Sequence, residues 1–412
     1  MLVAMKQLRQ QLAGMVGNIL EHYDNALYGL LAPFIAPLFF ADFDSLTALI
    51  MTYGIMPLGI ITRPIGSLFF GWIGDTFGRR QALSLSLTGM AFVTVAMGFL
   101  PVHKEVGVLA PILLALLRML QSFFMAGETV GGAIYVLEHT QSAKRTLLSS
   151  LYDASSVGGI LLASALVTAC SAFGVMEFGW RVLFWTGAST ALLGLFLRRT
   201  TEDTAVVASM PTPVRTKIFD NKRALLAIIC TAGFSHMTYT LAFDLMNGYI
   251  PIITSLNKTE VMKINSWLLV LDMLLLPCFG LLAFKVGKER VMKGAALFLA
   301  LAAVPLFSLL ASATLFTVIA VRCLLVIAGV AFAAPYHAWA MERVPQHLRY
   351  TILSLGYALG SQLIGKPTSA LCLWLYQLTG HSYAPGLYLL VFGLLAALSV
   401  HYRERCAEST EG

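Results

Sequence analysis

The stretch GWIGDTFGRR, residues 71–80, decides how the chain is interpreted, because a related stretch follows half a chain later. GLLAFKVGKE, residues 280–289, repeats its glycine spacing, so that Gly71 and Gly78 each have a counterpart 209 residues further on. Lys288 replaces the first of the two arginines. A stretch repeated at this distance indicates that the chain contains an internal duplication.

Three charged residues repeat in the same order at one constant shift. The shift is 204 residues, and the pairs are Arg118 with Arg322, Glu138 with Glu342, and Arg145 with Arg349. Two loops that recur half a chain apart are not expected by chance. They predict two repeats of one ancestor, the plan in which substrate binds at the midplane of the bilayer between two rocking bundles.

The composition of the chain places both repeats in a lipid bilayer. Of the 412 residues, 58% are hydrophobic and only 12% are charged, whereas soluble proteins carry about 25% charged residues. The net charge of +7 is explained by basic cytoplasmic loops, so no nucleic-acid partner is expected. The six cysteines form no Cys-x-x-Cys pair and indicate neither a disulfide framework nor a zinc site.

Twelve apolar runs are long enough to cross a bilayer, which takes about 20 residues each. They predict an all-α integral membrane protein with twelve transmembrane helices in two pseudo-symmetric six-helix bundles. The runs cover residues 11–38, 46–72, 80–100, 108–136, 147–172, 180–197, 224–254, 264–285, 291–310, 312–340, 351–377 and 384–401. The N-terminal bundle is expected at 1–198, a cytoplasmic linker at 199–223, and the C-terminal bundle with a short cytoplasmic tail at 224–412.

Lys and Arg residues outside the predicted spans fall almost entirely on one side. Twenty lie on the side that holds the N-terminus and four on the other. Because basic residues collect in cytoplasmic loops, both termini and the linker are predicted to be cytoplasmic. The first apolar run lacks a small-x-small cleavage site and is expected to remain as the first span of a multi-pass protein of the inner (plasma) membrane.

The first predicted span contains GNILEHYD, residues 17–24, which places two carboxylates in apolar surroundings. On a helix, its polar residues share a sector roughly 160° wide. They are Asn18, Glu21, His22, Asp24, Asn25 and Tyr28. Because a carboxylate facing lipid costs about 2.5–3.5 kcal/mol, this sector must face another helix or a cavity. Either the acids pair with a neighbouring helix, or one of them takes up a coupled proton.

The fourth predicted span repeats this pattern, with Arg118, Gln121 and Glu128 on one face. Arg118 suits a substrate carboxylate, because a guanidinium offers a fixed fork of donors and stays charged. The alternative is a permanent ion pair with Glu21 or Asp24. The candidate proton-coupling residues are Glu21, Glu128 and Asp24, and the candidate substrate-binding residues are Arg118, Gln121, Asn25, Tyr28 and Lys366.

In the second half, Lys366 lies in the eleventh predicted span and is followed by Pro367. The proline frees a backbone carbonyl and is expected to break the helix at a binding site. Pairing of Lys366 with Asp272 is the alternative. Intramembrane acids concentrate in the first repeat, because Phe332 stands where that repeat has Glu128. Proton chemistry is therefore predicted in the first half.

GWIGDTFGRR resembles the loop signature of the major facilitator superfamily, G-x-x-x-D-x-x-G-R-[RK]. Three further stretches resemble blocks of its metabolite:proton symporters, among which bacterial proline/betaine transporters are the nearest group. They are GNILEHYDNALYG (17–29), APILLALLRMLQSFFMAGETVGGA (110–133) and GWRVLF (179–184). The chain departs from that group in having no heptads after its last span, and Ala126 stands where the family has glycine.

The resemblance implies that the loop between the second and third spans acts as a cytoplasmic gate, together with matching loops further on. The gating residues implied are Gly71, Asp75, Gly78, Arg79, Arg80, Glu138, Arg145, Glu342 and Arg349.

The predicted function is secondary active transport: proton-coupled symport of a small polar metabolite, with a zwitterion such as proline or betaine favoured. Two alternatives stay open, a symporter of di- or tricarboxylic organic acids and a non-transporting receptor on the same scaffold. An enzyme is not expected, because no nucleophile elbow, HExxH or phosphate-binding glycine loop occurs. No cofactor is expected beyond the proton as coupling ion, and the chain is predicted to work as a monomer in the bilayer.

Overall fold

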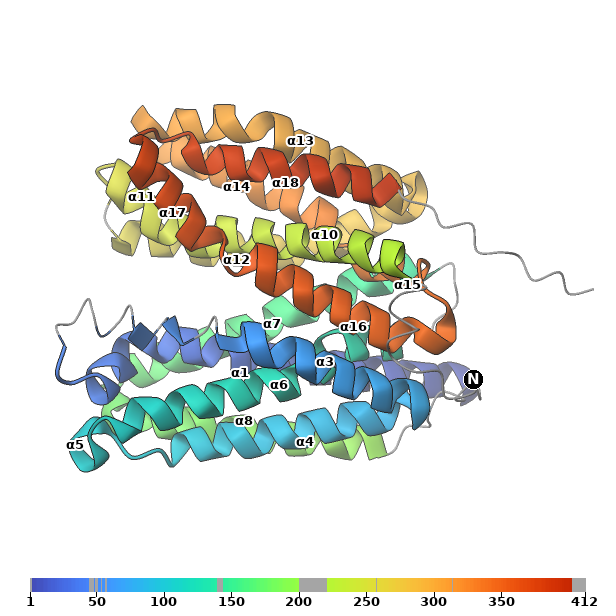
Figure 1. The fold of residues 1–412 in the computed structure, drawn as a ribbon, viewed down its shortest axis with the longest axis horizontal. Helices are drawn as coiled ribbons and strands as arrows, with labels where there is room; N and C mark the ends of the chain where they lie inside the picture. Colours follow the sequence, from blue (N-terminus) through green and yellow to red (C-terminus); the bar gives the residue numbers. More distant parts are fainter. Residues whose placement is uncertain are drawn as a thin grey trace, which may run out of the picture. The chain divides into compact units, whose positions relative to one another are not determined.

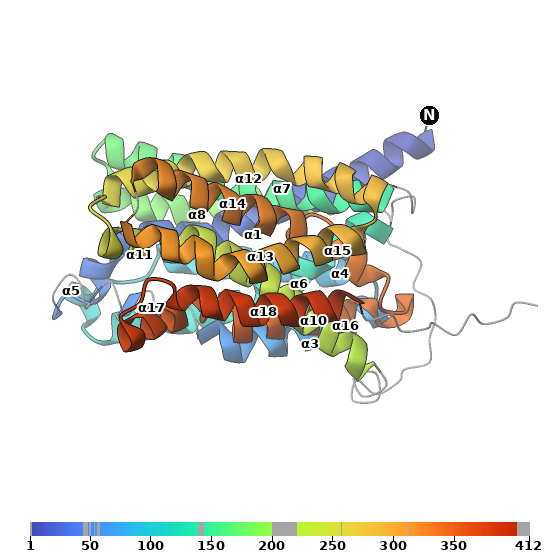
Figure 2. The same cartoon turned by 90° about the horizontal axis from the view of Figure 1, so that it is seen from above.

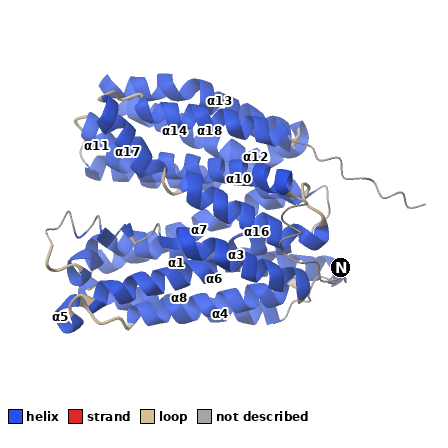
Figure 3. Cartoon of the chain, viewed as in Figure 1, coloured by secondary structure: helices blue, strands red, loops and turns tan. Residues whose placement is uncertain are grey.

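A computed structural model describes residues 2–43, 48, 51–52, 54–55, 58–138, 144–199, 221–256, 258–312 and 314–401. Within these residues the chain is helical and contains no strand (Figure 3). Its contacts divide it into two compact units, Met1–Met210 and Pro211–Gly412 (Figure 1). Most of the predicted linker, 199–223, lies outside the described residues.

Unit 1 contains six long helices and one short one. They are α1 (Leu2–Phe39), α3 (Gly59–Thr76), α4 (Arg79–Gly98), the short α5 (His103–Val106), α6 (Leu109–Glu138), α7 (Arg145–Ala172) and α8 (Met176–Arg199). The described part of the second predicted span, 46–72, becomes continuous helix only from Gly59.

Unit 2 contains the remaining spans, several of them interrupted. The seventh span consists of α10 (Lys222–Tyr239), the π-helical turn η3 (Thr240–Leu245) and α11 (Met246–Ile253). The eighth span is α12 (Lys258–Val286). The ninth is α13 (Lys288–Leu309), which is followed by η4 (Leu310–Ser312). The tenth is α14 (Leu315–Ala333) with α15 (Tyr336–Met341), then η5 (Gln346–Leu348). The eleventh is α16 (Arg349–Gly360), the π-helical turn η6 (Ser361–Gly365) and α17 (Thr368–Thr379), and the twelfth is α18 (Ala384–His401).

The same helix pairs pack together in both units, which confirms the predicted repeat. In unit 1, α1 packs on α7 and α8, α6 on α3 and α4, and α4 on α8. In unit 2 the corresponding pairs are α10 with α16 and α18, α14 with α12 and α13, and α13 with α18. Figure 2 shows α13 and α18 running along each other.

Glycines allow the closest of these helix contacts. A Cβ atom at Gly159 of α7 would lie 2.2 Å from the carbonyl oxygen of Ile19 in α1. In unit 2, a Cβ at Gly360 would lie 2.3 Å from the carbonyl oxygen of Ile229 in α10. Small residues at such crossings are typical of membrane helices, because lipid gives no hydrophobic drive and close backbone packing must replace it.

Both units have the surface of a protein embedded in lipid. In the described part of the chain, eight helices are long and apolar enough to cross a membrane. Large apolar side chains are exposed, among them Phe92, Trp267 and Phe316 with 71%, 76% and 81% of their surface accessible. In water such exposure would be costly, so the bilayer is the solvent of these faces.

The loop predicted to contain Asp75 is shorter than expected. Asp75 lies in the last turn of α3, and Arg79 is the first residue of α4, so only Phe77 and Gly78 connect the helices. Gly78 has φ 111°, and its counterpart Gly287 has φ 103° between α12 and α13. Only glycine adopts this conformation readily, which explains why the repeat keeps both glycines.

Candidate functional site

The candidate site in unit 1 is a chain of polar side chains from three helices. Thr94 of α4 donates a hydrogen bond to Oδ2 of Asp24 in α1, 3.4 Å away. Gln121 of α6 donates to the Thr94 hydroxyl at 3.0 Å and accepts a hydrogen bond from Nη1 of Arg118. Asp24, Gln121 and Arg118 are buried. We call this set, Asp24–Thr94–Gln121–Arg118, the polar chain of unit 1.

Tyr28 forms the other wall of the Arg118 environment. The guanidinium carbon lies 4.2 Å from the centre of the Tyr28 ring, the geometry of a cation–π contact. The Tyr28 hydroxyl is held by the carbonyl oxygen of Thr52, 2.9 Å away. The buried Nε of Arg118 has no hydrogen-bond partner among the described residues, so this guanidinium keeps at least one donor for a further acceptor.

Among the described residues, Arg118 forms no ion pair with Glu21 or Asp24. Two neutral side chains, Thr94 and Gln121, separate its guanidinium from the Asp24 carboxylate. The alternative of a permanent ion pair is therefore not what this structure shows. Instead, the acid and the base are both buried and are joined through hydrogen bonds of these two neutral side chains.

The other predicted residues of the first span point to different neighbours. Asn18 donates to the carbonyl of Tyr152 and to the hydroxyls of Ser155 and Ser156 on α7, at 2.7–2.8 Å. Glu21 is buried, whereas Asn25 is half-buried. Glu128 belongs to α6, but its side chain lies outside the described part, so its predicted role stays a prediction.

Two residues of this site were missed from the sequence. Thr94 links Asp24 to Gln121, yet a threonine in an apolar span gives no signal that it bridges charged groups. Gly187 of α8 faces Asp24, where an added Cβ would lie 2.3 Å from Oδ1 of the carboxylate. With 34 glycines in the chain, nothing in the sequence marks this one.

In unit 2, Lys366 follows the π-helical turn η6, and its amide N–H binds the carbonyl oxygen of Ser361 at 2.8 Å. The predicted break before Pro367 is therefore present as a widened turn.

Arg322, the counterpart of Arg118, is fully buried and donates to Asn265 and to the carbonyls of Ala242 and Val261. The repeated arginine thus has different partners in the two units.

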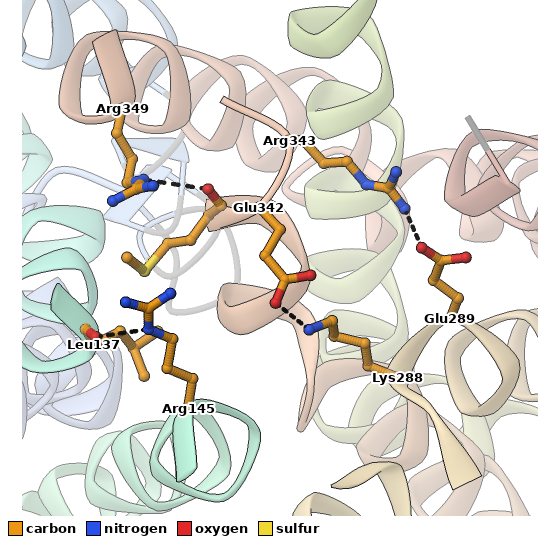
Figure 4. A network of polar contacts seen from close by, with 8 residues as sticks. Leu137, Arg145, Lys288, Glu289, Glu342, Arg343 and Arg349 are labelled. Carbon is orange, nitrogen blue, oxygen red and sulfur yellow. Dashed lines mark hydrogen bonds and ion pairs between the residues drawn. The ribbon is translucent and has the colours of Figure 1, made fainter. Parts of the chain in front are cut away.

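The predicted gating residues form separate polar contacts within each unit. Nη1 of Arg79 contacts both Oδ1 of Asp75 and the carbonyl oxygen of Gly74 at 2.6 Å. In unit 2, Lys288 pairs with Glu342, and Arg343 pairs with Glu289 at 2.7 Å (Figure 4). The Glu138 side chain lies outside the described part. Gly71 is buried in α3, and Arg80 is half-buried in α4.

Each unit contains the same contact, matched in atomic detail. Nε of Arg145 donates to the carbonyl oxygen of Leu137 at 3.2 Å, and Nε of Arg349 donates to that of Met341, also at 3.2 Å (Figure 4). Both donors and both acceptors are related by the shift of 204 residues seen in the sequence. Each arginine takes a carbonyl at the end of the preceding helical segment, which such ends leave without an intrahelical partner.

Two units of repeated helices with polar groups buried in their spans define a membrane transport protein. The chain belongs to the major facilitator superfamily, whose family model matches residues 15–366. It is 26% identical to the proline/betaine transporter of Salmonella typhimurium, over 94% of this chain and 81% of that protein. It is also 26% identical to the glycine betaine/proline/ectoine/pipecolic acid transporter OusA of Dickeya dadantii, with the same coverage.

Solved structures share the fold. The proton:xylose symporter XylE is 17% identical with a TM-score of 0.75, covering 96% of this chain and 95% of that one. The Escherichia coli fucose:proton symporter is 10% identical with a TM-score of 0.72, covering 97% of this chain and 100% of that one. At this identity the likeness concerns the fold alone.

Proposed function

We propose that the chain is a proton-coupled symporter of a small zwitterion of the proline or betaine type, working as a monomer in the cell membrane with both termini in the cytoplasm. The observation that carries the proposal is the polar chain of unit 1, in which a buried carboxylate and a buried guanidinium are linked but not paired. The names of the relatives from Salmonella and Dickeya point to the same substrate class.

Arg118 supplies the group for the substrate carboxylate. Its Nε has no protein acceptor among the described residues, and its Nη1 is bound to a neutral amide that a carboxylate outcompetes. Tyr28 presents an aromatic ring beside the same position, and aromatic faces attract quaternary ammonium groups. A ligand that carries both charges matches this set better than one with a single charge.

Asp24 supplies the group for the coupled proton, together with Glu21 and Glu128 as the other candidates. Among the described residues, Asp24 is buried and has a hydroxyl rather than a cation as its hydrogen-bond partner. A buried carboxylate in such a setting avoids its desolvation cost by accepting a proton. Proton uptake and substrate binding would then take place at the two ends of one hydrogen-bonded chain, which links them directly.

Uptake into proteoliposomes tests the proposal. Radiolabelled proline, betaine, and a di- and a tricarboxylic acid are offered with and without an imposed inward proton gradient. The proposal expects uphill accumulation of a zwitterion only when the gradient is present. Accumulation of the organic acids instead would establish the alternative substrate class, for which Arg118 is also suited. Zwitterion uptake that ignores the gradient would contradict proton coupling.

A further inference from the structure

The seventh span of unit 2 is widened by one π-helical turn, η3. In this turn, the amide N–H of Met246 binds the carbonyl oxygen of Leu241, five residues earlier. In an α-helix the same N–H would bind the carbonyl of Ala242, four residues earlier. The turn therefore separates the Ala242 carbonyl from its α-helical partner.

Arg322 of α14 takes this released carbonyl. Its Nη2 donates to the Ala242 oxygen at 3.0 Å and to Oδ1 of Asn265 in α12 at 2.5 Å, and its Nη1 donates to the Val261 oxygen at 3.3 Å. The residue is fully buried. One guanidinium thus ties three spans together, and each of these acceptors is neutral. A planar fork of donors suits this task, whereas a lysine is a single point of charge.

The turn that Arg322 holds contains Asp244. The side chain of Asp244 is exposed. One extra residue in a turn rotates the following helix by about 100° relative to a regular α-helix. The direction in which Asp244 points therefore depends on whether the turn in the seventh span is kept.

We propose that Arg322 is a positioning residue, which keeps the π-helical turn of η3 open and thereby sets the direction of the Asp244 side chain. The result is an acid in unit 2 with a fixed direction, for a charged group of a substrate. Only this last consequence rests on the proposed function; the placement of Asp244 does not. π-Helical turns are frequent at functional sites and need an outside partner for the backbone groups that they free.

The test is a labelling experiment at position 244. In a variant whose six cysteines are replaced by alanine, Asp244→Cys is reacted with a water-soluble maleimide in lipid nanodiscs, with and without Arg322→Gln. We expect the labelling rate at 244 to change by at least about fivefold, the factor equivalent to one ordinary hydrogen bond. A second reporter, His381→Cys in the exposed loop before α18, should label at the same rate in both backgrounds.

The matched control is Arg290→Gln, which removes a guanidinium from the exposed start of α13 and should leave labelling at 244 unchanged. An unchanged rate at 244 in folded Arg322→Gln would overturn the proposal. If this variant does not fold, Asn265→Ala decides in its place: it removes one acceptor of Arg322 and should shift the rate in the same direction by a smaller factor. Unchanged labelling in Asn265→Ala would likewise overturn the proposal.

Transport gives a second and separate readout. Arg322→Gln should raise KM for the zwitterion more than it lowers the maximal rate per folded protein, because the substrate loses a correctly placed acid. A loss of folded protein alone would leave KM unchanged and contradict the positioning role. If wild-type protein transports no zwitterion while labelling at 244 still depends on Arg322, the proposed function fails and the positioning role stands.

Discussion

Thr94 and Gln121 link the Asp24 carboxylate to the Arg118 guanidinium, and these neutral links have a different energetic consequence from a buried ion pair. Breaking a buried ion pair by removing one partner costs about 3–5 kcal/mol. An ordinary hydrogen bond contributes about 0.5–1.5 kcal/mol net. A site that must bind and release ligand in each cycle benefits from the weaker contacts, because its groups exchange partners at small cost.

Arg118→Lys tests the role of the guanidinium. Lysine keeps the positive charge but loses the fork of donors and the flat contact with Tyr28, so we expect the substrate Kd to rise at least about tenfold. The matched control is Arg181→Lys, whose arginine lies over Trp180 and donates to the carbonyls of Gly98 and Leu100. It should leave Kd unchanged. Equal affinity in Arg118→Lys, measured by calorimetry, would favour simple charge pairing.

Gly187→Ala tests the close approach of α8 to Asp24. The new Cβ would lie 2.3 Å from Oδ1 of Asp24 and 3.1 Å from Cγ2 of Thr94, so the carboxylate must shift, and we expect transport to be lost. Gly158→Ala is the control, because a Cβ there meets nothing within 4 Å and alanine in a helix is favoured by about 0.5–1 kcal/mol. Thermal unfolding and uptake of both variants are compared. Normal uptake in Gly187→Ala would show that the position of Asp24 is not critical.

At the scale of elements, the sequence predicted the spans and their repeat, but of the widened turns η3 and η6 it marked only η6. Hydrophobic runs and paired motifs are set by local composition, which is why Gly78 and Gly287 were found as equivalent turns. The turn η3 contains no proline, and its cause is the tertiary contact of Ala242 with Arg322. The turn η6 was anticipated only because Pro367 marks it. Contacts between distant residues leave no periodic signal in the chain.

The ion pair at the end of α3 gives a prediction at this scale. Asp75 and Arg79 join two helices across a two-residue turn, at a distance of 2.6 Å. In Asp75→Asn we expect the exchange rate to fall at least about tenfold, since gating steps often limit turnover, while Kd changes less than about twofold. Exchange in proteoliposomes and equilibrium binding are measured on the same preparation.

Glu289→Gln is the control for Asp75→Asn, because it removes the partner of Arg343 at the corresponding turn of unit 2. The Glu289 side chain is 37% exposed, and Arg343 keeps the carbonyl oxygen of Val400 as a second acceptor, so exchange should stay near the wild-type rate. A large loss of binding with a normal exchange rate in Asp75→Asn would assign Asp75 to the substrate site instead of the gate.

At the scale of the whole molecule, two copies of one bundle have acquired unequal chemistry. Both keep the same helix pairs and the same arginine-to-carbonyl contact before their fifth helix. Arg118 keeps a donor without a partner in the described structure, whereas Arg322 donates to acceptors on two other spans. Duplication supplied the scaffold twice. The polar chain of unit 1, with its neutral links, supports proton coupling in that half.

Neutralising the carboxylates of unit 1 tests this division for the complete transport cycle. Three variants are compared: Glu21→Gln, Asp24→Asn and Glu128→Gln. If the altered group carries the proton, the variant is expected to abolish accumulation driven by a pH gradient. At least one of them should still exchange substrate across the membrane. The reason is that a permanently neutral side chain mimics the protonated state, in which the loaded carrier can turn over. Uphill uptake and counterflow exchange are measured in the same proteoliposomes.

The two assays separate a proton site from a structural acid. An acid that serves only in packing would, as an amide, lower uphill uptake and exchange together, because the protein misfolds or loses substrate. Asp24→Asn is the most informative of the three, since the amide can still accept the Thr94 hydrogen bond and keep the polar chain intact. Wild-type accumulation in all three variants would show that protons use another group, or that transport is not coupled to protons.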